Sequence, residues 1–344
     1  MIEKYENFLY NCKYTAIKEA EPMKRREFIK LAAGILGYFA FGDMFSKNIS
    51  EAADLKKAYH IVLISDLHLP WRSKNFPQKT EGQNIFEQKK KMLQNINGWQ
   101  DAKEVALLGD FPARYGNEEE FLSVDEFLNE ISLPKYIAIG NHDYAYRDKP
   151  SKKGKLKRGT HEEQQKKLNA FKERYKMPAL YYTRTVLNYR LIYLAPDACD
   201  KLNVELSQKQ LEWLQGEIAS HANSPIIFFC HAPLKNTLLN YHKSINTPKA
   251  TAQPEQALEE ILKLAPKGSL WISGHTHTPK DNPSFANDDI NRYNDRIINI
   301  HNPTIDSKQC VTNSLFLLND RAIVKTFDHK KNIWLENFTR EYRF

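Results

Sequence analysis

Acidic, amide and histidine side chains recur in five short motifs along the chain. In order, the motifs are Asp66-Leu67-His68, Gly109-Asp110, Gly140-Asn141-His142-Asp143, His231 and Gly274-His275-Thr276-His277. Imidazole and oxygen groups are common ligands of divalent transition metals. The ordered set therefore has the ligand types of a two-metal site.

Each motif comes directly after an apolar, β-branched run. The runs are residues 61–64, 105–108, 136–139, 226–230 and 270–273. This composition is typical of buried parallel strands, and open α/β sheets bind ligands outside the carboxyl ends of their strands. We therefore expect five strand-to-loop junctions to bring the polar side chains to one rim.

The ordered set resembles the calcineurin-like metallophosphoesterases, whose pattern is D-x-H, G-D, G-N-H-[DE], H and G-H-x-H. The resemblance covers roughly residues 60–305, and no core metal ligand is missing. A single D-x-H or H-x-H is a weak signal, whereas five ordered motifs at strand ends are specific.

The resemblance implies a role for each ligand position. Asp110 would bridge the two cations. One cation would also be held by Asp66, His68 and His277, and the other by Asn141, His231 and His275. Mixed imidazole and oxygen ligation suits Mn, Zn or Fe better than an all-oxygen magnesium cage. We therefore expect two divalent transition metal ions as cofactors.

His142 and Asp143 are the candidate catalytic residues. His142 would donate a proton to the leaving-group oxygen, because imidazole exchanges protons near neutral pH. Asp143 would either orient the His142 ring or hold its own loop through backbone hydrogen bonds. Five histidines outside the motifs are interpreted as surface or structural residues: His161, His221, His242, His301 and His329.

The sequence departs from the family pattern at Ala113. Many members carry an acidic residue there, three positions after the bridging aspartate, which orients the catalytic histidine. Purple acid phosphatases need a tyrosine there to bind ferric iron, so Ala113 argues against that subclass. The next residue, Arg114, is the candidate substrate-binding residue, because guanidinium pairs with phosphate oxygens. A solvated loop arginine is the alternative.

The N-terminal segment carries a separate signal. Lys24-Arg25-Arg26-Glu27-Phe28-Ile29-Lys30 resembles a twin-arginine export motif, and an uncharged run follows at residues 31–42. That run is too short for an ordinary bilayer span and is typical of a signal-peptide core. Small residues offer a cleavage site near Ala52. A surface helix with a basic start is the alternative.

We expect three segments: residues 1–22 as an unstructured extension, 23–53 as a twin-arginine signal peptide and 54–344 as a single metallophosphoesterase domain. The twin-arginine translocation machinery would then be a partner, and the protein would be periplasmic or otherwise extracytoplasmic, membrane-anchored if the signal is kept. The cysteines beyond residue 53 are odd in number and show no framework spacing, which excludes a disulfide-stapled fold.

Apolar periodicity predicts helices over residues 83–98, 117–131, 161–176, 207–221 and 254–264. We expect a hairpin at residues 181–186 and 189–194, and antiparallel strands at residues 314–318, 322–328 and 333–338. Strands alternate with helices first and dominate later. This order favours the α/β class and an α/β/β/α sandwich of two mixed β-sheets flanked by helices.

A formal net charge of +8 is modest for 344 residues. Residues 144–160, however, carry seven basic side chains against one acid, Asp148. This run would attract an anionic substrate or contact a lipid surface, or is a solvated charge run. Its aromatic residues are confined to Tyr144 and Tyr146, so no specific nucleic acid is expected. The long polar connections 234–253 and 279–292 are candidates for substrate selection, or are structural cover.

Three functions remain open. The first is an exported phosphoesterase acting on phosphomonoesters or phosphodiesters of small molecules or lipid headgroups. The second is a nucleotide-sugar or lipid pyrophosphatase, because the first and last motifs also resemble UDP-diacylglucosamine hydrolases. Those enzymes work at the cytoplasmic face and carry arginine where His142 stands. The third is a non-catalytic scaffold of the same fold, against which the retention of all ligand positions counts.

Replacing both Arg25 and Arg26 by lysine tests the export motif. The variant keeps the charge and the apolar run but lacks the twin arginines, so we expect unprocessed precursor to accumulate in the cytoplasm while general secretion continues. Cell fractionation and immunoblotting measure the distribution. Export of the variant at the wild-type level would show that the segment is not a twin-arginine signal.

Overall fold

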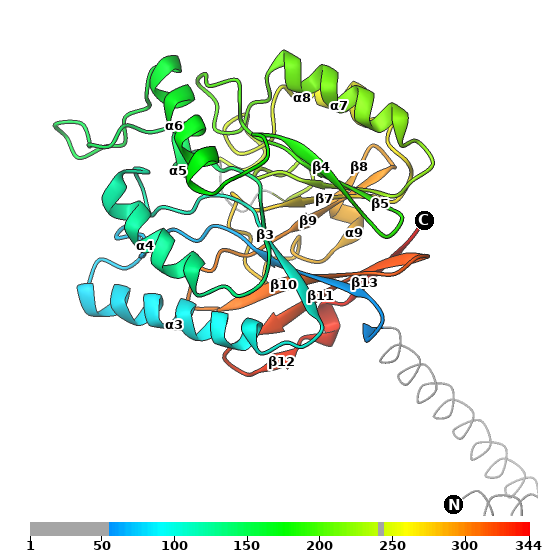
Figure 1. Cartoon of the computed structure of the whole chain (residues 1–344), viewed down its shortest axis with the longest axis horizontal. Helices are drawn as coiled ribbons and strands as arrows, with labels where there is room; N and C mark the ends of the chain where they lie inside the picture. Colours follow the sequence, from blue (N-terminus) through cyan, green and yellow to red (C-terminus); the bar gives the residue numbers. More distant parts are fainter. Residues whose placement is uncertain (1–54, 240–243) are drawn as a thin grey trace, which may run out of the picture. The chain divides into compact units, whose positions relative to one another are not determined.

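Two β-sheets are stacked in the structure, a computed structural model that describes residues 55–239 and 244–344 (Figure 1). These sheets belong to one contact unit, Ala58–Phe344. The predicted extension and signal peptide, residues 1–22 and 23–53, lie outside the described residues, as does His242.

The first sheet has seven strands in the order β12-β11-β10-β1-β2-β3, with β13 paired to β11. The strands are β1 (Tyr59–Ile64), β2 (Ala102–Leu107), β3 (Lys135–Ile137), β10 (Val311–Leu317), β11 (Arg321–Asp328), β12 (Ile333–Trp334) and β13 (Arg340–Arg343). The neighbours β1, β2 and β3 are parallel, whereas β10 pairs antiparallel with β1. The sheet is therefore mixed, and its parallel half carries the first three motifs.

The second sheet has six strands in the order β4-β5-β6-β7-β9-β8. The strands are β4 (Tyr182–Val186), β5 (Tyr189–Tyr193), β6 (Ile226–Phe229), β7 (Ser269–Ser273), β8 (Arg292–Tyr293) and β9 (Ile297–His301). Strands β5, β6, β7 and β9 run parallel, and the two edge strands run antiparallel. The last two motifs follow β6 and β7.

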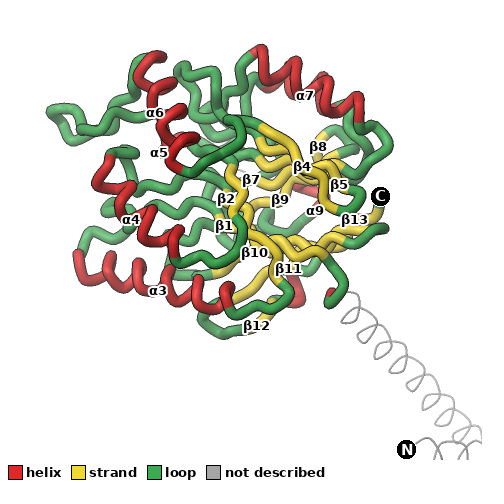
Figure 2. Tube along the Cα trace, in the orientation of Figure 1, coloured by secondary structure: helices red, strands yellow, loops and turns green. Residues whose placement is uncertain are grey.

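Helices lie on both sides of the stacked strands (Figure 2). Helices α3 (Lys79–Asn97) and α4 (Glu118–Asn129) run along the first sheet, and α7 (Gln208–Ser220) lies over the second with α8 (Glu255–Leu262) beside it (Figure 1). Four shorter or peripheral helices complete the described chain: α5 (Asn141–Tyr144), α6 (His161–Arg174), α9 (Asp288–Asn291) and the 3₁₀ helix η1 (Glu336–Phe338).

Side-chain alternation along β6 shows why the second sheet is covered on both faces. Ile227 and Phe229 belong to the main core, which also contains residues of the first sheet. Their neighbours Ile226 and Phe228 belong to a second core together with Leu214 of α7. Successive residues of a strand point to opposite faces, so an unbroken apolar run needs apolar layers on both sides. The layer order is α/β/β/α, which confirms the predicted fold class.

The five predicted helices and the predicted hairpin all form, with ends shifted by at most four residues. The strand predicted over residues 333–338 is wrong beyond Trp334. Only Ile333 and Trp334 pair with β11. The chain then turns through η1 and returns to the other end of β11 as β13. The apolar residues of this segment thus belong to a short strand and a turn rather than to one strand.

The structure places the cysteines that follow residue 53 in buried positions. Cys199, Cys230 and Cys310 are free thiols, so these residues form no disulfide framework. Two of the histidines that lie outside the motifs, His301 and His329, are also buried. No helix within residues 55–239 and 244–344 is both long and apolar enough to cross a bilayer.

Candidate metal centre

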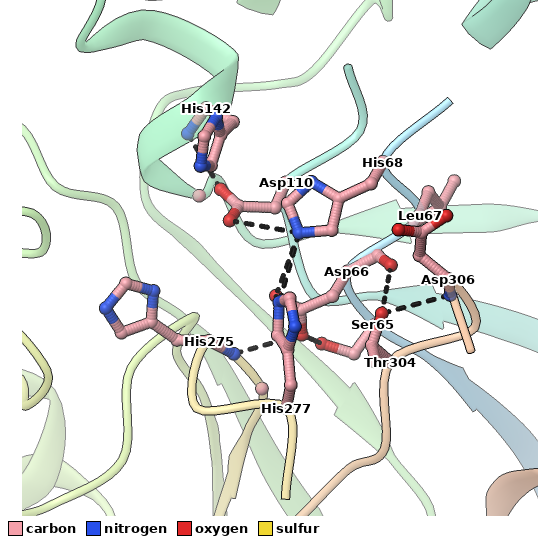
Figure 3. Close-up of polar contacts among 12 residues, drawn as sticks. Ser65, Asp66, Leu67, His68, Asp110, His142, His275, His277, Thr304 and Asp306 are labelled. Atoms are coloured by element: carbon pink, nitrogen blue, oxygen red, sulfur yellow. Dashed lines mark hydrogen bonds and ion pairs between the residues drawn. The ribbon is translucent and has the colours of Figure 1, made fainter. Parts of the chain in front are cut away.

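The polar motifs of both sheets meet at the carboxyl ends of five parallel strands. Asp66 and His68 follow β1, Asp110 follows β2, Asn141 and His142 begin α5 after β3, His231 follows β6, and His275 and His277 follow β7. In Figure 3 the side chains of Asp66, His68, Asp110 and His277 converge on one point. The arrangement matches the expected rim, and it draws ligands from two sheets rather than one.

Backbone strain is concentrated in these loops. Five of the motif residues have positive φ angles: Asp66 at 52°, His68 at 42°, Asp110 at 55°, His275 at 63° and His277 at 52°. Non-glycine residues seldom adopt this region, and each costs of order 1–3 kcal/mol unless its surroundings hold it. Strain at five neighbouring positions indicates that the fold is built to direct these side chains inward.

The motif glycines allow the loops to approach one another. Gly109 has a φ of 85°, and a Cβ there would collide with the backbone of Gly140. A Cβ on Gly274 would collide with the side chains of Ser65 and Asp66. Glycine is therefore required where two ligand-bearing loops cross at backbone distance.

One group of metal-ligand atoms consists of Asp66, His68 and His277. His277 Nε2 lies 3.0 Å from Asp66 Oδ1 and 3.0 Å from His68 Nε2. His68 and Asp66 are fully buried. Three donor atoms that face a common point at this spacing fit a single cation.

The second group consists of Asp110, His231 and His275. His231 Nε2 lies 3.3 Å from Asp110 Oδ2 and 3.1 Å from His275 Nδ1. The same Asp110 oxygen lies 3.8 Å from His68 Nε2, which belongs to the first group. Asp110 therefore stands between the two groups, where a bridging carboxylate would have to be.

His231 and His275 each use one ring nitrogen in a hydrogen bond to a backbone carbonyl and turn the other ring nitrogen towards the centre. The backbone carbonyl of Leu108 accepts a bond of 2.6 Å from His231 Nδ1, and that of Lys249 accepts one of 2.9 Å from His275 Nε2. These contacts leave His231 Nε2 and His275 Nδ1 directed at the centre, 3.1 Å from each other. Such outer contacts fix the tautomer and orientation of a metal-binding imidazole.

Two buried oxygens provide a direct test of whether the site fits metal ions. Asp66 Oδ2 accepts hydrogen bonds from Ser65 Oγ at 2.5 Å and from the backbone NH of His275 at 3.0 Å. Asn141 Oδ1, in contrast, is buried without a hydrogen-bond partner in the described part of the chain, and Asp66 Oδ1 faces His277 Nε2, another ligand atom, at 3.0 Å. Buried acceptors are rarely left unpaired. Cations at the two groups would satisfy both, so the donor set fits a pair of metal ions.

The charge states also suit metal ligands. Burial opposes ionisation of Asp110, but His231 and His142 hold the pKa of this carboxyl well below its usual range. Burial lowers the pKa of His275 to about 4. Burial disfavours the charged form of His231 too, yet the Asp110 carboxylate raises the pKa of His231 to about 9. A metal ion would therefore meet an ionised Asp110 and a neutral His275, and would displace a proton from His231.

His142 is oriented by a backbone carbonyl. Its Nδ1 donates a hydrogen bond of 2.8 Å to the carbonyl oxygen of Arg114, which leaves Nε2 for the centre. Ligand atoms of His142, His68 and Asp110 lie within 4.8 Å of one another. The Arg114 carbonyl therefore orients the His142 ring, although Ala113 offers no carboxylate for this role.

Asp143 does not contact the His142 ring, although it was one of two catalytic candidates. Its carboxylate accepts hydrogen bonds from the backbone NH groups of Asp110 at 3.0 Å, Phe111 at 2.7 Å and Gly140 at 2.7 Å. The second interpretation, in which Asp143 holds its loop, describes these contacts. We correct its assignment from a catalytic to a positioning residue, which ties the loops after β2 and β3 together.

A buried ion pair that no sequence motif predicted lies behind the centre. Lys89 Nζ of α3 lies 2.7 Å from Asp306 Oδ1 and donates hydrogen bonds to the carbonyls of Leu67 at 2.7 Å and His68 at 3.2 Å. Removing one partner of a buried pair typically costs about 3–5 kcal/mol. The available signal was the position of Lys89 on the apolar face of α3, four residues after Ile85.

The loop after β9 joins the two sheets next to the centre. The backbone NH of Asn302 donates to the Ser273 carbonyl at the end of β7, and that of Ile305 donates to the Ser65 carbonyl beside β1. Thr304 Oγ1 donates a hydrogen bond of 2.8 Å to the carbonyl of Asp66. This loop, residues 302–306, therefore fixes the distance between the ligand loops of different sheets (Figure 3).

Asp110→Asn tests the assignment of the shared ligand. Loss of the negative charge removes the carboxylate between the two groups, so we expect bound metal to fall below two ions per chain and phosphoesterase activity to fall by orders of magnitude. Elemental analysis of the purified protein measures the metal content. The matched control is Asp200→Asn at an exposed position. Two tightly bound ions and normal turnover in Asp110→Asn would disprove the assignment.

Comparison with known proteins agrees with this geometry. The family model for the calcineurin-like phosphoesterases matches residues 59–279. The fold is similar to that of purple acid phosphatase PPD1 from yellow lupin (Lupinus luteus) seeds, with a TM-score of 0.53, 13% identity and coverage of 83% of this chain. It is also similar to PhoD, with a TM-score of 0.52, 10% identity and coverage of 83% of this chain and 71% of that one.

These structural likenesses concern the fold alone. The chain spans about half of the lupin phosphatase, 53% of its length. No curated protein matches the sequence. The family match, in contrast, covers well over half of the chain and contains every motif at the centre. The chain belongs to the calcineurin-like phosphoesterase family.

Proposed function

We propose that this protein is an exported, dinuclear-metal-dependent phosphoesterase that hydrolyses phosphomonoesters or phosphodiesters. The observation that carries the proposal is the position of Asp110 between two groups of ligand atoms, with Oδ2 at 3.3 Å from His231 Nε2 and 3.8 Å from His68 Nε2. A pair of cations bound there would neutralise the phosphate charge and acidify the attacking water.

The side chains around the centre would position the phosphate ester. Arg72 lies beside the first ligand group, with Nη1 at 3.5 Å from His68 Nε2, and can pair with a phosphate oxygen. Its backbone NH donates to Asp306 Oδ2 at 3.3 Å, so the buried Lys89–Asp306 pair also anchors the loop that carries Arg72. Arg114 keeps its candidate role in substrate binding, because it lines the cleft next to His142.

His142 would protonate the leaving group. Attack of water forms one P–O bond while the bond to the leaving oxygen breaks, and that oxygen takes a proton from His142 Nε2. Burial, helped by Arg72, lowers the pKa of His142 although Asp110 opposes this shift. A bound phosphate would bring negative charge to the ring and favour the imidazolium. His142 would therefore acquire its proton with the substrate.

The export part of the proposal is supported by the sequence alone. The Lys24-Arg25-Arg26 segment and the uncharged run at residues 31–42 have the order of a twin-arginine signal. Export of a folded chain would allow metal loading in the cytoplasm, which matters because raw affinity selects poorly among transition metals.

His142→Ala separates proton donation from metal binding. The variant should keep its metal content but lose about 10²- to 10⁴-fold in rate on alkyl phosphates, whose leaving groups need a proton. On a nitrophenyl ester the loss should be far smaller, because nitrophenolate leaves without protonation. Steady-state kinetics on both substrates at fixed metal content measure the difference.

His221→Ala is the matched control, because His221 lies at the end of α7, on the helix that covers the outer face of the second sheet. It should change neither rate. Equal losses on both substrates in His142→Ala would show that His142 is not the proton donor.

A further inference from the structure

A cleft of about 760 Å³ opens beside His142. Its walls combine two chemical characters. Four basic side chains line it: Arg72, Lys74, Arg114 and Lys155. Apolar and aromatic surface comes from Trp71, Tyr115 and Leu156. Volumes of roughly 300–1,000 Å³ are typical of small-molecule sites, so the cleft can hold a group much larger than a phosphate.

The single acidic residue of the cleft lining does not neutralise these cations. Glu120 Oε2 accepts hydrogen bonds from the backbone NH groups of Tyr115 at 2.7 Å and Gly116 at 2.9 Å, so it closes the turn before α4. The ammonium groups of Lys74 and Lys155 contact no carboxylate among the described residues. Arg114 donates to the Gly154 carbonyl at 2.8 Å, which leaves its charge uncompensated.

Arg72 shows the imbalance most clearly. Its side chain is half-buried, and no carboxylate of residues 55–239 or 244–344 pairs with its guanidinium. The polar atom that it does approach is His68 Nε2, on a ligand of the candidate metal centre. A cation placed beside a site for two further cations is repelled unless an anion lies between them. The phosphate ester supplies that anion. The basic groups that remain for a further negative charge in the cleft are Lys74, Arg114 and Lys155.

The position of His142 defines which part of a substrate reaches this cleft. His142 lines the cleft and is held by Arg114, which lines it too. A proton donor must lie next to the leaving oxygen. Given the proposed function, the group released by hydrolysis therefore lies in the cleft.

We propose that the substrate's leaving group carries a negative charge of its own beside an aromatic or apolar portion. After the P–O bond breaks and the leaving oxygen takes the proton of His142, the released anion remains paired with Lys74, Arg114 and Lys155. A carboxylate or a second phosphate on the released alcohol supplies this charge. This inference rests on the proposed function, because only a substrate that is hydrolysed has a leaving group. The binding of an anion in the cleft, in contrast, does not require turnover.

Two substrate comparisons test the inference in the metal-loaded protein. The first compares 3-carboxyphenyl phosphate with phenyl phosphate, and the second compares benzene-1,3-diyl bisphosphate, which releases 3-hydroxyphenyl phosphate, with phenyl phosphate. We expect kcat/KM to be roughly tenfold or more higher for at least one charged leaving group, and the preference to fall as salt is added. The arm that shows the preference identifies carboxylate or phosphate as the source of the charge.

A double variant, Lys74→Gln with Lys155→Gln, assigns the preference to the cleft. It should reduce the ratio of kcat/KM for charged over uncharged leaving groups towards one. The matched control, Lys209→Gln with Lys331→Gln, removes the same charge from exposed lysines outside the cleft lining and should keep the ratio. A kcat/KM ratio of one in the wild type, or an unchanged ratio in the cleft variant, would overturn the inference. Turnover of either substrate would still support the proposed phosphoesterase activity.

Binding of the released groups separates the two proposals if no substrate turns over. Calorimetry on the same protein should detect binding of 3-hydroxybenzoate or 3-hydroxyphenyl phosphate, and weaker binding of phenol. Binding of the charged ligands should weaken in Lys74→Gln/Lys155→Gln. Binding without turnover would contradict the phosphoesterase and retain the anion site. Equal binding of charged and uncharged ligands would contradict the anion site.

Discussion

The negative charge of Asp110 is the constraint on which the rest of the structure depends. It is almost completely buried at the boundary of two sheets, and a buried charge is stable only when it is compensated. Its Oδ1 accepts a hydrogen bond of 2.7 Å from the backbone NH of His142, and its Oδ2 faces His231 from the opposite sheet. Loops from both sheets must approach this carboxylate closely. The motif glycines and the positive φ angles of the ligand residues make that close approach possible.

The surrounding scaffold explains how strained ligand loops keep their positions. Asp143 fastens the loops after β2 and β3 to each other, and residues 302–306 fasten β1 to β7. Lys89 holds the loop after β1 from behind. Each of these contacts bonds backbone groups rather than ligand atoms. The ligand atoms therefore stay free for metals, while the loops that carry them are fixed by residues that need no contact with substrate.

Local patterns were sufficient to predict the fold class, the five longer helices, the strands before the motifs and the hairpin, because apolar periodicity and motif spacing are properties of short segments. They did not predict β9, which pairs with β7, or its neighbour β8 at the edge of the sheet. The other misses have a common cause. Lys89 and Asp306 are 217 residues apart, so their pairing is invisible in either segment. Arg72 has no motif around it, and its meaning comes from the cleft that the fold creates. Four of residues 333–338 are apolar, but only Ile333 and Trp334 pair with β11 before the chain turns.

Electron paramagnetic resonance of the protein saturated with Mn²⁺ tests most directly the proposal that the Asp110 carboxylate joins two metal positions. Two Mn²⁺ ions that share the Asp110 carboxylate should be exchange-coupled, because a bridging ligand connects their unpaired electrons. We predict two ions per chain and a coupled spectrum that becomes uncoupled in Asp110→Asn. Saturation at one ion per chain, or a spectrum of isolated ions in the wild type, would contradict the account.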